Sequence, residues 1–546
     1  MTATATRPPV SGGSDVRRAP RSTARAVTSV VVVGAVVLAG NPFEAWNRGG
    51  LDQVGRFFAA AVRPELGGDF LALVWREALV TVSYAVLGTA LAMALGVLGA
   101  IVLSRRWWTR PGRGRPGAGW QVTRLLGVVP RSVHEVVWGL LLLNVLGLDP
   151  LVAVLAIGIP FGAITAKVFA DAIDDADPTT HAALRAAGAG RLAALAYGIA
   201  PAVRDELVSY GFYRFECSIR SAAILGIVGA GGLGFQLSLS FTSLRYGEVW
   251  TALWALVLLN GAADAWSGWV RRRSPSVLAA DGARLRSGGQ RSGAFATGVV
   301  LVPGIALSWW WLELSPAGLW SARTQRELGY LAGELLPPGL RSDWGTILSQ
   351  ALDTVVLSVL AMAIAFVGAS VVALLASGTV GPGGVAGTVV RGATRGVLLL
   401  TRAIPPPVWA TVALFVLFPG PWPGAVALGV YNLGVLGRLL AEALESTDDG
   451  PALALRAAGA SGLEAAAYAT VPAALDRFVS LGLYRWEVTI RETAVVGVVG
   501  AGGLGRALDQ ELSSFAWSNV AGILLALVAV TFLVDATSTA VRRRRA

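Results

Sequence analysis

Runs of apolar residues long enough to cross a lipid bilayer recur along this chain, and they constrain its fold more than any other feature. A membrane-spanning helix needs about 20 such residues, because the hydrocarbon core is roughly 30 Å thick. Of the 546 residues, 54% are hydrophobic and 14% are charged, and the mean hydropathy is +0.61. A soluble core of this size needs far less apolar surface. The composition therefore places the chain in a bilayer, and the runs predict an all-α integral membrane protein.

The net charge of +11 does not indicate nucleic-acid binding. The arginines stand in short blocks between apolar runs, where they orient membrane spans. A single cysteine, Cys217, excludes an internal disulfide or a cysteine-built metal site, and only His134 and His181 are available for a histidine cluster. We therefore expect no metal and no cofactor in this chain.

The chain is a tandem duplication. A shift of 271 residues aligns 130–234 with 401–505 without a gap, and roughly 30 of about 50 positions between Ala183 and Gly234 are identical. A shift of 273 aligns the apolar run from Ala78 with the run from Ala351. We divide the chain into a first unit at 1–270 with its core at 76–270, a linker at 271–293, and a second unit at 294–546 with its core at 349–541.

Each unit offers about six apolar stretches of spanning length, about twelve in total. The run at 26–41 is interpreted as a retained first helix rather than a cleaved signal peptide. The expected spans are 26–41, 76–104, 131–147, 149–171, 206–230 and 248–270 in the first unit, and 294–312, 349–377, 402–419, 421–442, 477–501 and 517–539 in the second.

Six crossings per unit place every arginine-rich block on one side, which the positive-inside rule makes the cytoplasm. Both termini are then cytoplasmic. An even number of spans also gives both copies the same orientation, so the units form a parallel repeat about an axis along the membrane normal. The linker, rich in Arg, Ser and Gly, is interpreted as a flexible cytoplasmic joint.

Charged residues stand inside the fifth span of each unit, in "YRFECSIR" (213–220) and "YRWEVTIR" (484–491). A lone charge at the bilayer centre costs about 2.5 to 3.5 kcal/mol. The spacing predicts helical ion pairs, which leave surplus arginines that either snorkel to the interface or line a passage for an anion. The candidates for this passage are Arg131, Arg214, Glu216, Arg220, Arg402, Arg485, Glu487 and Arg491. Two further matched pairs, Lys167 with Asp171 and Arg438 with Glu442, are interpreted as interfacial ion pairs.

Two more elements recur. "GIVGAGGLG" and "GVVGAGGLG" have the spacing of a dinucleotide loop, but no strand precedes them, so we interpret them as helix ends and close-packed turns, with direct ligand contact as the alternative. They contain Gly229, Gly231, Gly232, Gly234, Gly500, Gly502, Gly503 and Gly505. After each fourth span, a short alanine-rich helix, a glycine turn, a second helix and a proline stop are predicted, with marker residues Arg185, Gly188, Pro201, Arg456, Gly459 and Pro472.

The segments from 181 to 201 and from 452 to 472 resemble the EAA coupling loop of bacterial ATP-binding cassette importer permeases. With the charged and glycine motifs that follow them, they resemble the phosphonate-type permeases of that class, over about 78–237 and 351–508. The acid that opens the family motif is replaced by Ala182 and Leu453. The family more commonly consists of single-unit homodimers, whereas two units are fused here.

The resemblance implies a permease of the bacterial inner membrane that imports phosphonate, phosphite or phosphate. It also implies two ATPase subunits on the cytoplasmic face, which would hold ATP and magnesium, and an extracytoplasmic substrate-binding protein. The chain contains no Walker phosphate loop, so its energy would come from a partner or from an ion gradient. The alternative is an ion-coupled secondary transporter of a small anion, and a membrane enzyme acting on lipid phosphates is a more distant one.

Overall fold

The computed structural model describes residues 35–37, 39–41, 46–109, 117–273, 302–335, 343–380 and 384–543. Most of the first expected span, most of the linker and the start of the span at 294–312 lie outside these residues. The same holds for the basic blocks at 17–25, 110–116 and 544–546.

The described residues fold into helices. They also contain one isolated β-bridge, between Trp46 and Leu417. The first unit contains α2 (Leu51–Ala59), α3 (Gly68–Leu103), α4 (Arg105–Trp108), α5 (Ala118–Leu126), α6 (Val128–Ser132), α7 (Glu135–Leu146), α8 (Leu151–Asp175), α9 (Thr179–Ala186), α10 (Arg191–Gly198), α11 (Ala200–Leu225), α12 (Leu233–Thr242) and α13 (Tyr246–Arg273). The second contains α15 (Ala322–Leu335), α16 (Trp344–Ser377), α17 (Gly384–Ala403), α18 (Pro406–Val416), α19 (Pro421–Glu445), α20 (Gly450–Ala457), α21 (Gly462–Ala465), α22 (Val471–Val498), α23 (Gly503–Ser513) and α24 (Trp517–Arg543).

The two units repeat the same helix pairs, as the duplication predicts. In the first, α3 packs along α8, and in the second, α16 packs along α19. Small residues bring these backbones close together, as is usual between helices in a membrane. A Cβ added at Gly96 would lie 2.4 Å from Thr165, and one at Gly429 would lie 2.8 Å from Ile364.

Six described helices are long and apolar enough to cross a membrane: α3, α8, α13, α16, α19 and α24. Three bent helix pairs raise the number to nine if each is one span. The helix α22 is absent from this set, since charged residues interrupt its apolar sequence. The expected total of about twelve is therefore not reached within the described residues, where the first span of each unit is incomplete.

The third span of each unit is not the straight helix that was expected at 131–147 and 402–419. In the second unit, α17 and α18 meet at 90°, and in the first, α7 is bent by 82° from the helices before it. The run Pro405, Pro406 and Pro407 explains the bend in the second unit, because proline cannot continue a preceding helix. In the first unit, His134 caps the new helix by accepting a hydrogen bond from the Val136 N–H at 3.3 Å.

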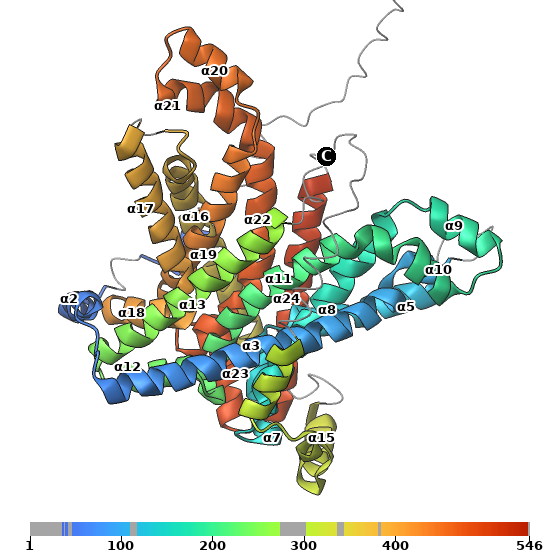
Figure 1. Cartoon of the computed structure of the whole chain (residues 1–546). Coiled ribbons are helices and arrows are strands. Elements are labelled where there is room, and N and C mark those ends of the chain that lie inside the picture. The colour runs from blue at the N-terminus through green and yellow to red at the C-terminus, as the bar shows by residue number, and fades with distance from the viewer. Residues whose placement is uncertain are drawn as a thin grey trace, which may run out of the picture.

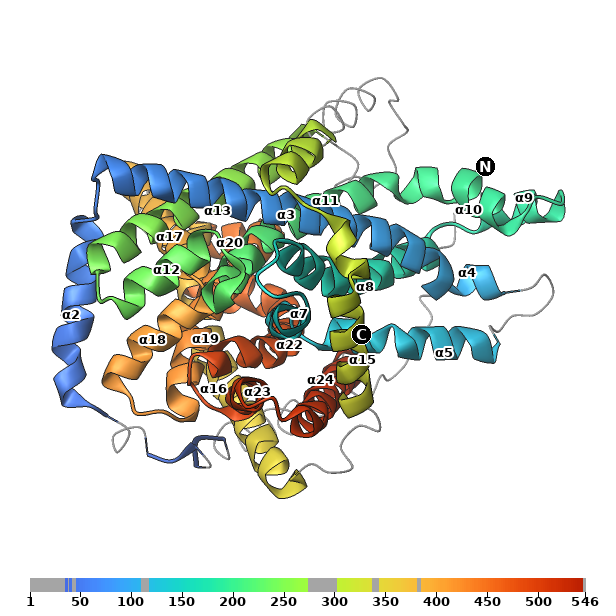
Figure 2. The same cartoon turned by 90° about the horizontal axis from the view of Figure 1, so that it is seen from below.

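The units form two arms that diverge from a common base (Figure 1). One arm, with α8 and α11, ends at α9 and α10, and the other, with α19 and α22, ends at α20 and α21. Seen from below, α7 and α22 lie side by side near the centre of the molecule (Figure 2), and α2 runs along the flank of the second unit beside α18.

The apolar cores interlock the two units. Val133 and Val137 of the first unit pack into the cluster formed by α22, α23 and α24. In the equivalent place on the other side, Ile404 and Val408 of the second unit pack into the cluster of α12 and α13. The exchange is reciprocal, as expected for two copies related by an approximate two-fold axis.

The glycine motifs form the predicted helix ends and tight turns. Positive φ angles occur at Gly229, Gly231 and Gly232 (110°, 91° and 76°) and again at Gly500, Gly502 and Gly503 (92°, 95° and 70°). In each unit a threonine hydroxyl on the first long helix accepts a hydrogen bond from the backbone just after the turn, Thr81 from Leu233 N–H at 2.9 Å and Thr354 from Leu504 N–H at 2.8 Å. Gly234 and Gly505 allow α12 and α23 to approach the backbone of α11 and α22, since an added Cβ would lie 1.8 Å from Ala223 O and 2.6 Å from Ala494 O.

We expect Gly234→Ala to destabilise the fold by about 1 to 3 kcal/mol, because a backbone carbonyl cannot move aside for the new methyl group. The measurement is the thermal unfolding midpoint of the detergent-purified protein. The matched control is Gly396→Ala on α17, where an added Cβ meets nothing within 4 Å. Equal midpoints for the two variants would contradict this account of the turn.

Candidate functional site

The candidate site lies on the equivalent helices α11 and α22, which carry the two charged motifs. Arg214 and Arg485 are each 7% exposed, and Glu216 is 6% exposed. Buried charges in such helices must be compensated by neighbours, because an isolated ion is far less stable in an apolar interior than in water. The partners of these side chains therefore show how the two units fit together.

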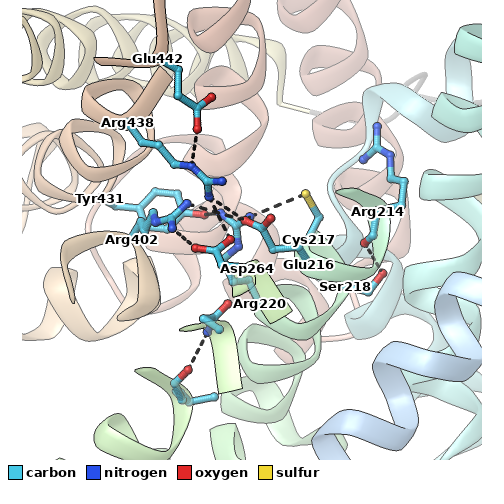
Figure 3. A network of polar contacts seen from close by, with 12 residues as sticks. Arg214, Glu216, Cys217, Ser218, Arg220, Asp264, Arg402, Tyr431, Arg438 and Glu442 are labelled. Carbon is cyan, nitrogen blue, oxygen red and sulfur yellow. Dashed lines mark hydrogen bonds and ion pairs between the residues drawn. The ribbon is translucent and has the colours of Figure 1, made fainter. Parts of the chain in front are cut away.

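Five charged side chains form a cluster at one contact between the units, which we call the inter-unit ion cluster: Glu216, Arg220, Asp264, Arg402 and Arg438. Its two acids come from α11 and α13 of the first unit, and Arg402 and Arg438 come from α17 and α19 of the second. In Figure 3, Arg402 and Arg438 face Glu216 and Asp264.

The cluster is held by direct ion pairs. Glu216 lies 3.0 Å from Arg220, 3.7 Å from Arg402 and 3.9 Å from Arg438. Asp264 pairs with Arg402 and lies 2.9 Å from Arg438. The helical pair of Glu216 with Arg220, predicted from the spacing, is confirmed, and so is Arg438 with Glu442 at 2.8 Å.

Asp264 was missed by the sequence analysis. The available signal was an acid near the inner end of an apolar span, with Asp535 at the equivalent position of the second unit. An ionisable residue within a membrane span marks a functional or pairing site by default.

The equivalent contact on the other side is built differently. Glu487 pairs with Arg542 at 2.6 Å rather than with Arg491, so the predicted helical pair is wrong. Arg491 instead donates to the backbone carbonyl of Arg131 at 2.8 Å. The C-terminal end of α24 brings Arg542 within reach of Glu487, and this tertiary neighbour overrides the local spacing.

The predicted pair of Lys167 with Asp171 is not formed either, since Asp171 lies 3.7 Å from Arg124 on α5. Among the described residues, the side chains of Arg131, Lys167 and Asp535 form no ion pair. On this side, therefore, the described residues form no ion pair between the two units.

The two buried arginines of the motif have different partners. Arg485 lies 2.5 Å from Glu492 and donates to the side-chain oxygen of Asn432. Arg214 donates to the Tyr210 hydroxyl from Nε at 2.7 Å. Its guanidinium lies 4.9 Å from the ring centre of Phe161 and 5.0 Å from that of Tyr210. In Figure 3 it stands apart from the inter-unit ion cluster.

Two equivalent tyrosines of α11 and α22 are partly exposed. Tyr213 is 37% exposed and Tyr484 is 41% exposed, although both lie inside helices of the bundle. Tyr213 lies near Arg214, Arg220 and Tyr484 of the other unit. Arg220 also donates to Tyr431 at 3.4 Å. Tyrosine and guanidinium groups of the two units therefore come close together in the region of α11 and α22.

The predicted coupling segments lie at the tips of the two arms (Figure 1). Gly188 and Gly459 have φ angles of 88° and 94° and end the first short helix in each segment. Arg185 donates to Ala189 O at 2.6 Å, and Arg456 donates to Thr379 O at 3.0 Å. In the first segment the second helix ends at Gly198, just before Pro201, as predicted. In the second segment the helical turns continue through Pro472 into α22, so the predicted stop is wrong there.

Each coupling segment exposes the same apolar side chains. Leu192 and Tyr197 are 58% and 78% exposed, and their equivalents Leu463 and Tyr468 are 62% and 79% exposed. In the second segment, Ser461 caps α21, and its backbone and side-chain hydrogen bonds lower the pKa of Glu464. Exposed apolar groups repeated at two equivalent tips are typical of a protein-binding surface.

Comparisons with known proteins identify relatives of this chain. Residues 373–546 match the family model described as "Binding-protein-dependent transport system inner membrane component". The chain is 26% identical over 495 residues to the phosphate-import permease protein PhnE of Mycolicibacterium smegmatis, covering 91% of this chain and 90% of that protein. It is 35% identical over 213 residues to the phosphite transport system permease protein PtxC of Stutzerimonas stutzeri, covering 39% of this chain and 76% of that protein. One chain from a structure of the MetNI methionine ABC transporter aligns with a TM-score of 0.32 and 20% identity, covering 36% of this chain and 94% of that chain.

We expect Asp264→Asn to destabilise the fold by about 3 kcal/mol, because it leaves Arg402 and Arg438 buried with one acid fewer. The matched control is Asp535→Asn, which removes no ion pair of the described residues and should change stability by less than about 1 kcal/mol. Thermal unfolding of the purified protein measures both. Equal losses of stability in the two variants would contradict the difference in ion pairing between Asp264 and Asp535.

Proposed function

Because the chain belongs to the family of binding-protein-dependent transport system inner membrane components, we propose that it forms both permease units of an importer for a phosphorus oxyanion. Membership makes it a multi-pass membrane protein and a transport subunit rather than an enzyme. The similarity to PhnE over 495 residues carries the proposal, because it extends across both units. The ion-coupled alternative is disfavoured, since this family works with a substrate-binding protein.

The substrate class is supported by the relatives and by the tyrosine and arginine side chains near α11 and α22. Two relatives are a phosphate-import and a phosphite transport permease, and a third, from Escherichia coli, is a putative cryptic phosphonate transport permease that is 35% identical over 118 residues. Phosphate, phosphite and phosphonates all present anionic oxygens to which guanidinium and hydroxyl groups can donate. We propose that the anion passes between α11 and α22, beside Tyr213 and Tyr484.

We further propose that two ATPase subunits bind the coupling segments, one at α9 and α10 and one at α20 and α21. These subunits would hold ATP and magnesium, and a binding protein would deliver the anion from the outer side. The diverging arms support this arrangement, because closure of the ATPase subunits would draw their tips together and rock the units against each other (Figure 1). The coupling segments and both chain termini would then be cytoplasmic, in the bacterial inner membrane.

Transport in proteoliposomes tests the proposed function. The chain, its cognate ATPase and its binding protein are reconstituted together, and uptake of phosphate, phosphite and methylphosphonate is measured with ATP or with a non-hydrolysable analogue. We expect ATP-dependent uptake of at least one of the three anions. Uptake that needs only an ion gradient, or failure with all three anions, would overturn the proposal.

Docking of the ATPase has its own test. We expect the double variant Tyr197→Ala with Tyr468→Ala to lower ATPase co-purification by about tenfold or more, since exposed aromatic side chains dominate binding at interfaces. Tyr330→Ala is the matched control, because Tyr330 is 58% exposed on α15, away from both coupling segments in Figure 1. Unchanged co-purification of the double variant would place the ATPase contact elsewhere.

A further inference from the structure

The duplicated motif does not give equivalent charges to the two units. The equivalent arginines Arg214 and Arg485 are equally buried, at 7% exposure. Arg485 is neutralised by Glu492, seven residues later on α22, at 2.5 Å. The residue equivalent to Glu492 in the first unit is Ser221, whose hydroxyl donates to Glu135 on α7 at 2.5 Å. Arg214 forms no ion pair with a described carboxylate, so it keeps its full positive charge.

The other neighbours of the two arginines differ in the same sense. Asn432, which accepts a hydrogen bond from Arg485, is replaced in the first unit by Phe161, whose ring faces Arg214 at 4.9 Å. Aromatic faces stabilise a buried cation without neutralising it. The first unit therefore holds its arginine by rings and one hydroxyl, and the second holds its arginine by an acid and an amide.

The groups around Arg214 leave donors available for an anion. The Tyr210 hydroxyl accepts hydrogen bonds from the Nε and Nη2 of Arg214, so its own hydrogen remains free to be donated. The ring of Tyr213 lies 5.7 Å from the guanidinium, and Tyr213 is 37% exposed. Its hydroxyl forms no hydrogen bond with a described residue.

We propose that Arg214, Tyr210 and Tyr213 form an oxyanion-binding site of the passage, and that Glu492 closes the equivalent site in the second unit. The inference rests on the proposed function, because it places the phosphorus oxyanion at one named position in the passage. Of the equivalent arginines Arg214 and Arg485, only Arg214 lacks an acid partner among the described residues, and its positive charge gives the anion a favourable stop. A second one nearby would hold it more tightly, whereas conduction requires binding weak enough for release.

Charge variants of the two arginines test this asymmetry, with initial uptake rates of phosphate, phosphite and methylphosphonate measured in the reconstituted complex. We expect Arg214→Gln to lower the uptake rate by about tenfold or more. The loss of rate in Arg485→Gln should be several times smaller. Arg214→Lys keeps the charge and should restore a substantial part of the rate. Equal losses for the two Gln variants, or no rescue by Lys, would overturn the inference.

The missing acid can also be supplied. Ser221→Glu places a carboxylate seven residues after Arg214, as Glu492 lies after Arg485, and Ser221→Gln matches it in size without charge. We expect uptake by Ser221→Glu to be about tenfold lower than by Ser221→Gln, with equal ATPase co-purification. Equal rates would overturn the inference, and if neither variant assembles, the arginine series decides.

The wild-type complex separates failure of this inference from failure of the proposed function. Absence of oxyanion uptake by the wild type would overturn both. Uptake by the wild type that persists undiminished in Arg214→Gln would overturn only the assignment of the binding site.

Discussion

A charge within a bilayer-spanning helix has to be compensated by neighbouring groups, and this constraint determines how the two units meet. Glu216 and Asp264 of the first unit lie against Arg402 and Arg438 of the second, where the helices of both units cross. Apolar side chains such as Val137 and Ile404 could pack in many registers, because dispersion is not directional. Ion pairs at about 3 Å fix one register, so the polar contacts specify the geometry that the apolar cores stabilise.

The ion pairs between the units lie on helices that lead to the coupling segments. The inter-unit ion cluster includes residues of α11 and α19, the two helices that connect to the coupling segments at the ends of the two arms. A movement imposed on those tips acts along stiff helices on the place where the units are paired. Among the described residues the ion pairs join the units on one side, since the equivalents Arg131, Lys167 and Asp535 form no ion pair there. Rocking of the arms would therefore cost less electrostatic energy at the contact without ion pairs than at the inter-unit ion cluster.

The sequence was sufficient for the all-α membrane fold, the parallel repeat, the tight glycine turns and the helix–turn–helix form of the coupling segments. Each of these depends on local properties: apolar length, self-similarity, and positive φ at positions such as Gly188 and Gly459. The side-chain partners were less accessible. Identical spacing predicted a helical pair for Glu216 with Arg220 and for Glu487 with Arg491, yet only the first forms. Asp264, the bend at Pro405–Pro407 and the partner of Asp171 depend on which helices lie side by side, and spacing within one helix does not contain that information.

Fusion of the two units makes such differences between them available to evolution. In a homodimer of identical units, an acid introduced beside one buried arginine appears beside the other as well, because symmetry repeats every contact. A homodimeric passage therefore has both arginines neutralised or neither. In the fused chain, Ser221 and Glu492 occupy equivalent positions with opposite consequences for Arg214 and Arg485. The replacements of Asn432 by Phe161 and of Glu492 by Ser221 concern the partners of the same arginine, whereas the arginine itself is retained in both copies. This pattern, with a common cation and different compensation, is expected when one copy keeps the structural ion pair and the other is free to present its charge to a passing anion.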